Sequence, residues 1–305
     1  MHSGYCYQPV HIDAARNATD DFNLFHDSKK WDRIHQNPFG MPIVLGFQLE
    51  ALIEYLVTRF RSDAGEDVLI REHHLQYSNY QFTFADVVRP GETFSVEIRK
   101  TVNRIEEAGQ IANRVVLRKE GGLVLIGFQR ESTSALCMPE TDFSLVEDLD
   151  RCEDRSWVAG GRYFLKRKFL NTGNGKNFLA GSLVDQHYYF DELENRVRFP
   201  TMFTVSLLSC ALLEKARQEG YSFEANPVVY TGHAISVNRD LQETLKSNDR
   251  IHLLVGRVEE IPAGSGLGKK NFKQQLFRCF GLLSGNRVLF RAEVEMAPLH
   301  ELLEA

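Results

Sequence analysis

Residues 38–57 read PFGMPIVLGFQLEALIEYLV, and this stretch decides the fold. It is apolar on almost every side of a helix, and Glu50 and Glu54 are its only charged residues. A helix that is apolar nearly all round is typical of a buried element. We therefore expect one long buried helix in the first half of the chain.

A second stretch of the same kind lies in the second half, where residues 199–216 read FPTMFTVSLLSCALLEKA. Met202 stands near its start, as Met41 does in the first stretch. Lys215 suits the far end, because helix C-termini favour positive charge. We again expect one buried helix.

Similar material follows each of these stretches. Segments of alternating apolar and polar residues, separated by turns rich in Gly and Pro, predict β-strands. They are residues 73–85, 92–102, 111–120 and 123–132 in the first half, and 226–241, 250–261, 271–283 and 286–297 in the second. The chain is therefore a repeat of itself. We expect an α+β fold in which each half wraps a curved antiparallel sheet around one helix.

The acidic stretch at residues 140–155, ETDFSLVEDLDRCEDR, has little strand character. We expect it to link a first domain at residues 1–139 to a second at residues 156–305.

Composition excludes several classes of protein. The 305 residues carry a net charge of -5, so no broad nucleic-acid surface is expected. The five cysteines form no CxxC pair, which argues against disulfide frameworks and zinc sites and favours a reducing compartment. No metal site is expected. The N-terminus lacks the basic and apolar segments of a signal peptide, and the longest apolar run is too short and too charged to span a membrane. We expect a cytoplasmic protein.

The stretch DDFNLFHD at residues 20–27 concentrates polar groups ahead of the first helix. Asp21 and His26 are a carboxylate and an imidazole that a loop can point into one cleft. Within reach of one water molecule, such a pair can act as base and acid. The same residues also fit an Asx turn and a partly buried histidine, so the spacing alone shows only that the chemistry is possible. Asp27 is expected to be solvated.

Two motifs carry a resemblance to a known family. Residues 21–26, DFNLFH, resemble the D-x-N-P-[LIV]-H signature of MaoC-like (R)-specific enoyl-CoA hydratases. Residues 42–46, PIVLG, resemble the P-I-[VA]-H-G run that opens the central helix in that family. The close match covers residues 19–56, and the rest of the chain is similar in element order. The resemblance implies two tandem hotdog folds that form a pseudo-dimer.

The resemblance also implies roles for particular residues. Asp21 and His26 would share the catalytic water, and Asn23 would orient the substrate. Gly40, Met41 and Gly46 would bind substrate near the helix start, where backbone N–H groups favour the negative charge of an enolate. No cofactor is implied beyond the CoA or phosphopantetheine that forms part of the substrate.

The chain departs from the family pattern around these residues. Leu24 replaces the proline of the signature, and Leu45 replaces the histidine before Gly46. Asp20 stands where the family has a small residue, and Ala51 lies near where it often has a hydroxyl group.

The second half repeats the motif only in part. His187 precedes Met202 by as many residues as His26 precedes Met41, which puts His187 in register with His26. Ser182 then falls at the position of Asp21, and Asp185 lies nearby but out of register. We expect Ser182, Asp185 and His187 to be a vestigial second site.

Three functions follow from these observations. The first is an (R)-specific hydratase or dehydratase acting on 2-enoyl or 3-hydroxyacyl thioesters of CoA or acyl carrier protein. The second is a hotdog thioesterase that uses Glu50 or Glu54. The third is a non-catalytic acyl-binding or assembly protein, which Leu45 favours. The sequence leaves open whether two such chains form a homodimer.

Overall fold

The computed structural model describes residues 4–138, 141–144, 146–262 and 273–304. Residues 139, 140 and 145 of the predicted domain boundary and linker lie outside this part, as do residues 271 and 272 of a predicted strand. The domain limits at 139, 140 and 155 therefore stay predictions.

The first half begins with a short strand and a helix, continues through the long helix α2, and ends in strands. Its elements are β1 (Tyr5–Cys6), α1 (Pro9–Thr19), η1 (Leu24–His26), η2 (Trp31–Arg33), α2 (Gly46–Asp63), α3 (Glu66–Glu72), β2 (Tyr77–Phe84), β3 (Thr93–Ile98), β4 (Val102–Arg104), α4 (Ile105–Ala108), β5 (Gln110–Lys119) and β6 (Gly122–Ser132).

The second half follows a similar order. Its elements are β7 (Ser156–Val158), β8 (Tyr163–Phe169), α5 (Thr172–Gly181), α6 (Gln186–Tyr189), β9 (Phe190–Asp191), β10 (Arg196–Val197), α7 (Thr201–Ser206), α8 (Leu208–Gln218), β11 (Val228–Asn238), α9 (Arg239–Glu243), β12 (Arg250–Gly256), β13 (Glu259–Pro262), β14 (Lys273–Leu283), β15 (Arg287–Pro298) and α10 (Leu299–Glu304).

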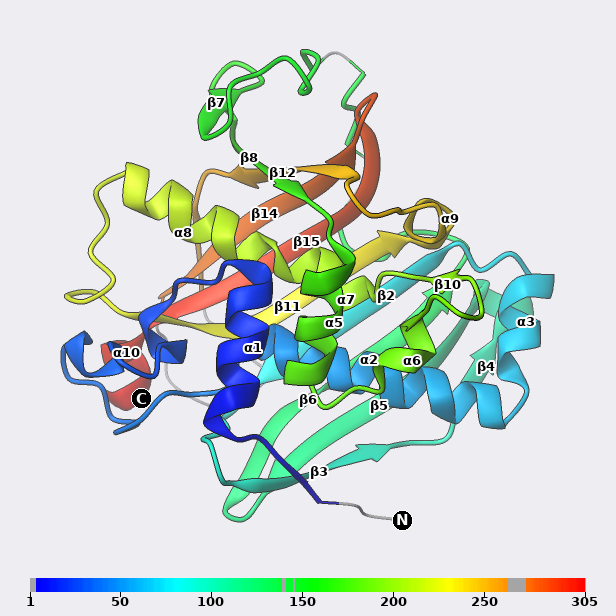
Figure 1. Ribbon diagram of the computed structural model, residues 1–305, viewed down its shortest axis with the longest axis horizontal. Helices are drawn as coiled ribbons and strands as arrows, with labels where there is room; N and C mark the ends of the chain where they lie inside the picture. The colour runs from blue at the N-terminus through cyan, green and yellow to red at the C-terminus, as the bar shows by residue number, and fades with distance from the viewer. Residues whose placement is uncertain (1–3, 139–140, 145, 263–272, 305) are drawn as a thin grey trace.

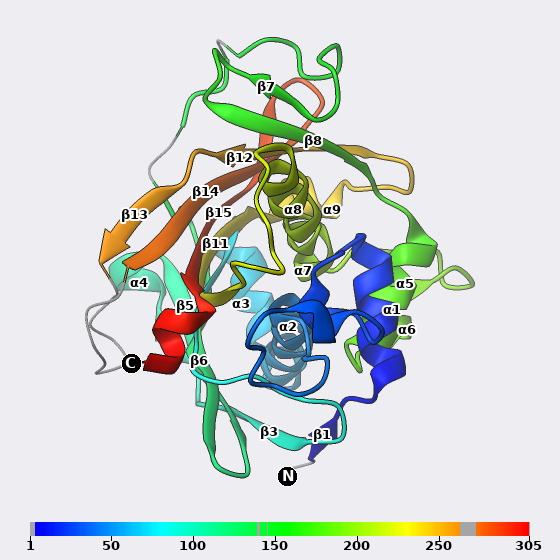
Figure 2. The same cartoon turned by 90° about the vertical axis from the view of Figure 1, so that its left-hand side faces the viewer.

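One antiparallel sheet runs through both halves. Within the described residues its order is β1-β3-β5-β6-β2-β11-β15-β14-β12-β8-β7, and the halves meet where β2 pairs with β11. Figure 2 shows this sheet curving around α2 and α8, with α1 and α5 side by side on the other side of these helices. The expected architecture of two helices wrapped by curved antiparallel sheet is confirmed.

The two central helices differ. Helix α2 is continuous and carries ten buried residues, Glu50 and Glu54 among them. The second stretch was expected to form one helix, but it divides at Leu207 into α7 and α8. The side chains of Thr204 and Ser206 bond back to the carbonyls of Thr201 and Phe203. Hydroxyl groups that bond to the preceding turn compete with the helical hydrogen bonds and bend helices, which accounts for the break.

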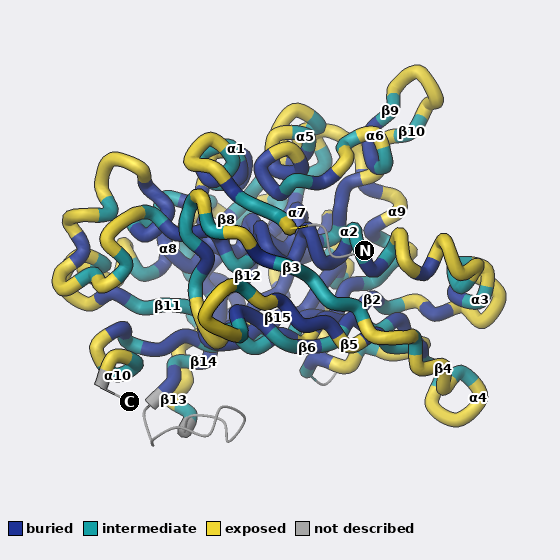
Figure 3. The backbone as a smooth tube through the Cα atoms, turned by 90° about the horizontal axis from the view of Figure 1, so that it is seen from below, coloured by how far each residue is buried: buried dark blue, intermediate teal, exposed yellow. Residues whose placement is uncertain are grey.

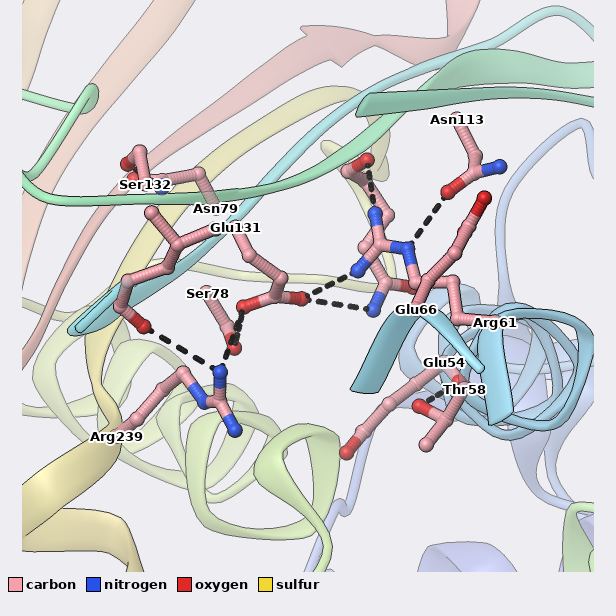
Figure 4. Close-up of polar contacts among 12 residues, drawn as sticks. Glu54, Thr58, Arg61, Glu66, Ser78, Asn79, Asn113, Glu131, Ser132 and Arg239 are labelled. Atoms are coloured by element: carbon pink, nitrogen blue, oxygen red, sulfur yellow. Dashed lines mark hydrogen bonds and ion pairs between the residues drawn. The ribbon is translucent and has the colours of Figure 1, made fainter. Parts of the chain in front are cut away.

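A buried polar network fixes the end of α2 to the sheet (Figure 4). The guanidinium of Arg61 donates to Glu131 Oε1 at 2.8 Å, to Asn113 Oδ1 at 2.7 Å and to the Gln129 carbonyl at 3.0 Å. Glu131 also accepts from Ser78. Because each charged group has partners, burying the pair does not leave an isolated charge.

Figure 3 shows where the chain is exposed: the β9–β10 hairpin and the segment around α4 lie at the surface, whereas much of α2 is buried. In the part of the chain that the structure describes, no helix has the length and apolar character needed to cross a membrane.

Candidate active site

The stretch at residues 20–27 forms a compact loop between α1 and η1. Helix α1 ends at Asp20, whose φ of 53° lies in the left-handed region. The Asp21 carboxylate then accepts from the Asn23 N–H at 2.9 Å, and the Asn23 side chain accepts from the Phe25 N–H at 3.1 Å. Two successive Asx turns thus reverse the chain and direct His26 inward.

His26 is buried, with 5% of its surface exposed, and its orientation is fixed. Its Nδ1 donates to the Ile43 carbonyl at 2.8 Å, so Nε2 is the nitrogen that keeps a lone pair. Burial lowers the pKa of His26 below its usual value, the Arg16 guanidinium lowers it further, and Asp21 and the Ile43 carbonyl oppose the shift. The side chain is therefore a neutral imidazole at neutral pH and can accept a proton.

Asp21 is 3% exposed and lies near two side chains of the site. Its charge raises the pKa of both His26 and Tyr230. His26 and Asn23 line the cavity described below, whereas Asp21 is not among its lining residues. The carboxylate is placed to act on His26 and Tyr230 rather than from the cavity wall.

The other two acids of this loop have separate partners. Asp20 is exposed and pairs with Lys168 from β8. Asp27 was expected to be solvated, but it is buried and pairs with Arg16 at 2.7 Å. Arg16 lies on α1, so this pair joins the loop to the helix and compensates the burial of the Asp27 carboxylate.

A cavity of about 820 Å³ lies between the two halves. This is within the range of roughly 300–1,000 Å³ that small-molecule sites occupy. The first half supplies the start of α2 and the end of β2, including Gly46, Leu49 and Phe84. The second half supplies residues of α8, β11, β14 and β15, such as Leu212 and Tyr230. His26 therefore faces a mainly apolar space built by both halves.

The predicted helix-start residues divide into two groups. Gly46 lines the cavity, and a Cβ there would lie 3.1 Å from the Phe84 ring, so glycine allows this close approach. Gly40 and Met41 are exposed and are not among the lining residues. The N–H groups of Ile43, Val44 and Leu45 donate to Phe25, Val88 and Gln48. The N–H groups that begin α2, those of Gly46 and Phe47, have no carbonyl partner within the helix.

The second half does not reproduce this site. Met41 precedes α2, whereas Met202 lies inside α7, so the two methionines from which the register was counted stand at different places relative to their helices. Asn23 and Asp185 both cap the short helices that follow, and counting from these caps puts Tyr188 at the position of His26.

The three residues predicted for a vestigial site are not brought together in the cavity. His187 and Asp185 are exposed, and Ser182 is buried with its carbonyl accepting from the Tyr7 hydroxyl. Tyr188 packs against Tyr55 and Tyr189, with ring centroids 5.6 and 5.0 Å apart. Aromatic side chains thus occupy the place where the first half has a histidine.

The two acids of α2 bind groups from the second half. The Glu50 carboxylate lies 2.8 Å from His233 Nδ1, and both side chains are fully buried. Glu54 accepts from the N–H groups of Thr201 and Met202 at the start of α7. Neither acid is among the lining residues of the cavity, so neither is placed to attack a thioester held there.

Two features of the site were not foreseen. Tyr230 lines the cavity, its hydroxyl lies 3.2 Å from Ser209 Oγ, and burial together with Asp21 raises its pKa, so it stays a hydrogen-bond donor. His233 is buried and paired with Glu50. Alternation within β11 predicted a strand, and a histidine on its buried face was the one available signal.

Within the described residues, no group of three or more His, Cys, Asp or Glu side chains could hold a metal ion. The five cysteines are free.

Comparison with solved structures places this geometry among known folds. A proposed MaoC domain protein dehydratase from Chloroflexus aurantiacus J-10-fl is similar over 97% of this chain and 93% of its own, with a TM-score of 0.56 and 10% identity. A conserved hypothetical protein from Mycobacterium tuberculosis with a double hotdog fold is similar over 97% and 94%, with a TM-score of 0.52 and 11% identity. The chain has a double-hotdog fold.

A MaoC-like dehydratase is also similar to this double-hotdog protein, over 97% of this chain and 96% of its own, with a TM-score of 0.53 and 11% identity. No family model and no curated protein matches the sequence. The predicted resemblance to MaoC-like double-hotdog proteins is confirmed for the fold. At these identities the likeness does not extend to a specific activity.

Proposed function

We propose that this double-hotdog protein is an (R)-specific hydratase or dehydratase of 2-enoyl and 3-hydroxyacyl thioesters. The observation that carries the proposal is His26, a buried neutral imidazole held by the Ile43 carbonyl on the wall of an apolar cavity of about 820 Å³. The MaoC-like dehydratases among similar structures agree with this reaction class. The thioester would be carried by CoA or by an acyl carrier protein.

In the hydration direction, a water molecule bound to His26 adds to C3 of the enoyl thioester. Nε2 of His26 accepts the proton of the water, and the electron pair of the C2–C3 double bond moves to the thioester as an enolate. The imidazolium then returns a proton to C2, which completes the 3-hydroxyacyl product. Asp21, buried near His26, stabilises the imidazolium while it exists.

The enolate needs donors at the thioester oxygen. The N–H groups at the start of α2 and the Tyr230 hydroxyl are the donors at this part of the cavity. Asn23, which lines the cavity and caps η1, orients the substrate from the other side. These groups are fixed by the fold before substrate binds, which is the condition for strong electrostatic stabilisation.

The test is hydration of crotonyl-CoA and longer enoyl-CoA thioesters. The reaction is monitored through the loss of the enoyl absorbance. His26→Ala should lower kcat/KM by about 100-fold or more, as expected for loss of general acid–base catalysis. Asp21→Asn should also lower kcat/KM, because the imidazolium loses the charge that stabilises it. Asp20→Asn is the matched control, because Asp20 is the adjacent acid but is exposed and paired with Lys168. It should retain wild-type activity.

Absence of hydration at every chain length in the wild type would overturn the proposal. Equal losses of kcat/KM in Asp20→Asn and Asp21→Asn would show that Asp21 has no specific role in catalysis. Release of free CoA without hydration would identify a thioesterase instead.

A further inference from the structure

A second polar cluster lies on the cavity wall, on strands of the second half. It consists of Thr231 on β11, Gln274 on β14 and Glu295 on β15, and all three residues line the cavity. His26 and the start of α2 belong to the first half. The cavity thus has two polar regions on different elements, and the mechanism uses only one of them.

Thr231 lies in a β-bulge at the cavity wall. In the pairing of β11 with β15, Tyr230 is opposite Met296 and Gly232 is opposite Glu295, so Thr231 has no partner in the ladder. Tyr230 and Thr231 both line the cavity. Bulges are common next to sites, where they can re-aim a side chain.

The cluster is ordered by its own contacts. Gln274 Nε2 donates to Thr231 Oγ1 at 2.8 Å, and both residues are 6% exposed. Gly232 leaves room for the Glu295 carboxylate, since a Cβ at this position would lie 3.1 Å from Glu295 Oε2.

The Glu295 carboxylate has no compensating partner among the residues that the structure describes. Within residues 4–138, 141–144, 146–262 and 273–304, no side chain pairs or hydrogen-bonds with its carboxylate. Burial raises the pKa of Glu295, Glu293 raises it further, and His233 opposes the shift. A half-buried carboxyl group on an apolar wall favours a ligand that brings a hydrogen-bond donor.

We propose that Thr231, Gln274 and Glu295 bind a hydroxyl group on the acyl chain of the substrate, away from the thioester. This rests on the proposed function, because the hydroxyl formed at C3 must lie beside His26 and cannot be the group bound here. A hydroxyl group both donates, to Glu295, and accepts, from the Thr231 hydroxyl. A carboxylate on the chain would be repelled by Glu295, and an ammonium group would cost more to desolvate in this cavity.

The test measures binding alone, so that it does not depend on turnover. Non-reactive S-alkyl-CoA thioethers of medium chain length, with and without one hydroxyl group at successive chain positions, are titrated by calorimetry. Matched pairs of free fatty acids, hydroxylated and plain, form a second arm. For the best position, the wild type should bind the hydroxylated analogue about tenfold more tightly than the plain one, as expected for a hydrogen bond to a charged group.

Thr231→Val and Glu295→Gln should each reduce this preference to a small fraction while binding of the plain analogue stays the same. Thr83→Val is the matched control, because Thr83 also lines the cavity but lies on β2 of the first half. It should keep the preference. Thermal unfolding of each variant checks that it is folded. Glutamine has nearly the shape of glutamate, so Glu295→Gln still tests the proposal if Thr231→Val does not fold.

Two results overturn the proposal: no preference in either ligand arm, or equal weakening of plain and hydroxylated thioethers by Thr231→Val. The second result would mean that the cluster contacts the pantetheine arm. A preference for the hydroxylated analogue in a protein without hydratase activity would contradict the proposed function but would still support this binding site.

Discussion

At the scale of single residues, the site depends on how one histidine is held. The Ile43 carbonyl fixes Nδ1 of His26 as the donor, and burial keeps the ring neutral. Because only the neutral ring can accept a proton, kcat/KM should fall as the pH drops through the pKa of His26. That pKa lies below the usual value of about 6.5, so the acid limb of the rate profile should lie below pH 6.5.

The contribution of Asp21 can be measured without activity. Asp21 raises the pKa of His26, so Asp21→Asn should lower the pKa of the ring still further. An NMR titration of the His26 ring in both proteins checks this, with His26→Gln used to assign the signal. An unchanged or higher pKa in Asp21→Asn would show that the carboxylate does not act on the histidine.

The sequence predicted this loop better than its surroundings. The D-x-N-x-x-H spacing fits the two turns that Asp21 and Asn23 form, because Asx turns depend on neighbours close in the chain. The pairing of Asp27 with Arg16 depends on how α1 lies against the loop, and no local pattern encodes that. The Glu50–His233 pair joins residues 183 positions apart, which is beyond any spacing argument.

At the scale of elements, Glu54 links α2 to the start of α7. Burial raises its pKa from 4.5 to about 7, although the N–H groups of Met202 and Thr201 oppose the shift. The folded state therefore holds this proton more tightly than the unfolded chain. The stability that Glu54 contributes is complete below pH 4.5 and is lost as the pH rises to about 7, by at most about 3 kcal/mol.

Glu54→Gln should remove this pH dependence, because an amide does not ionise. Urea denaturation at pH 5 and pH 8 should show the variant gaining stability relative to the wild type at the higher pH. Glu72→Gln is a control, since Glu72 is an exposed acid at the end of α3. Parallel pH profiles for Glu54→Gln and the wild type would contradict the assignment.

The elements themselves followed from the sequence to different degrees. The apolar surface of α2 and the alternation of the strands were strong signals, because burial decides both. The division of the second helix at Leu207 was not readable, since the hydroxyl groups of Thr204 and Ser206 bond back to the helix only in the folded chain. Nor could the sequence show that α7 begins before Met202 whereas α2 begins after Met41.

At the scale of the whole molecule, the two halves are joined by more than a linker. Strands β2 and β11 form one ladder, and Glu50 and Glu54 of α2 bind His233 and the start of α7. We expect one cooperative unfolding transition, because separating the halves would leave buried polar groups without their partners.

The two tryptophans make this measurable, since Trp31 lies in the first half and Trp157 in the second. Trp31→Phe and Trp157→Phe leave one fluorescent reporter each, and urea midpoints from the two variants should coincide with the midpoint from circular dichroism. A first-half reporter that unfolds separately from a second-half reporter would show independent domains.

The cavity wall comes from both halves, but the histidine and its carboxylate come from one of them. In a protein assembled from two identical subunits, every mutation in the gene appears twice, so a change that improves substrate fit also alters the residues that do chemistry in the other copy. In this fused chain a mutation in β11, β14 or β15 appears once. Under the proposed function, the second half is therefore free to diverge toward new acyl groups while selection preserves the first, and we expect related chains to differ most where their second halves face the cavity.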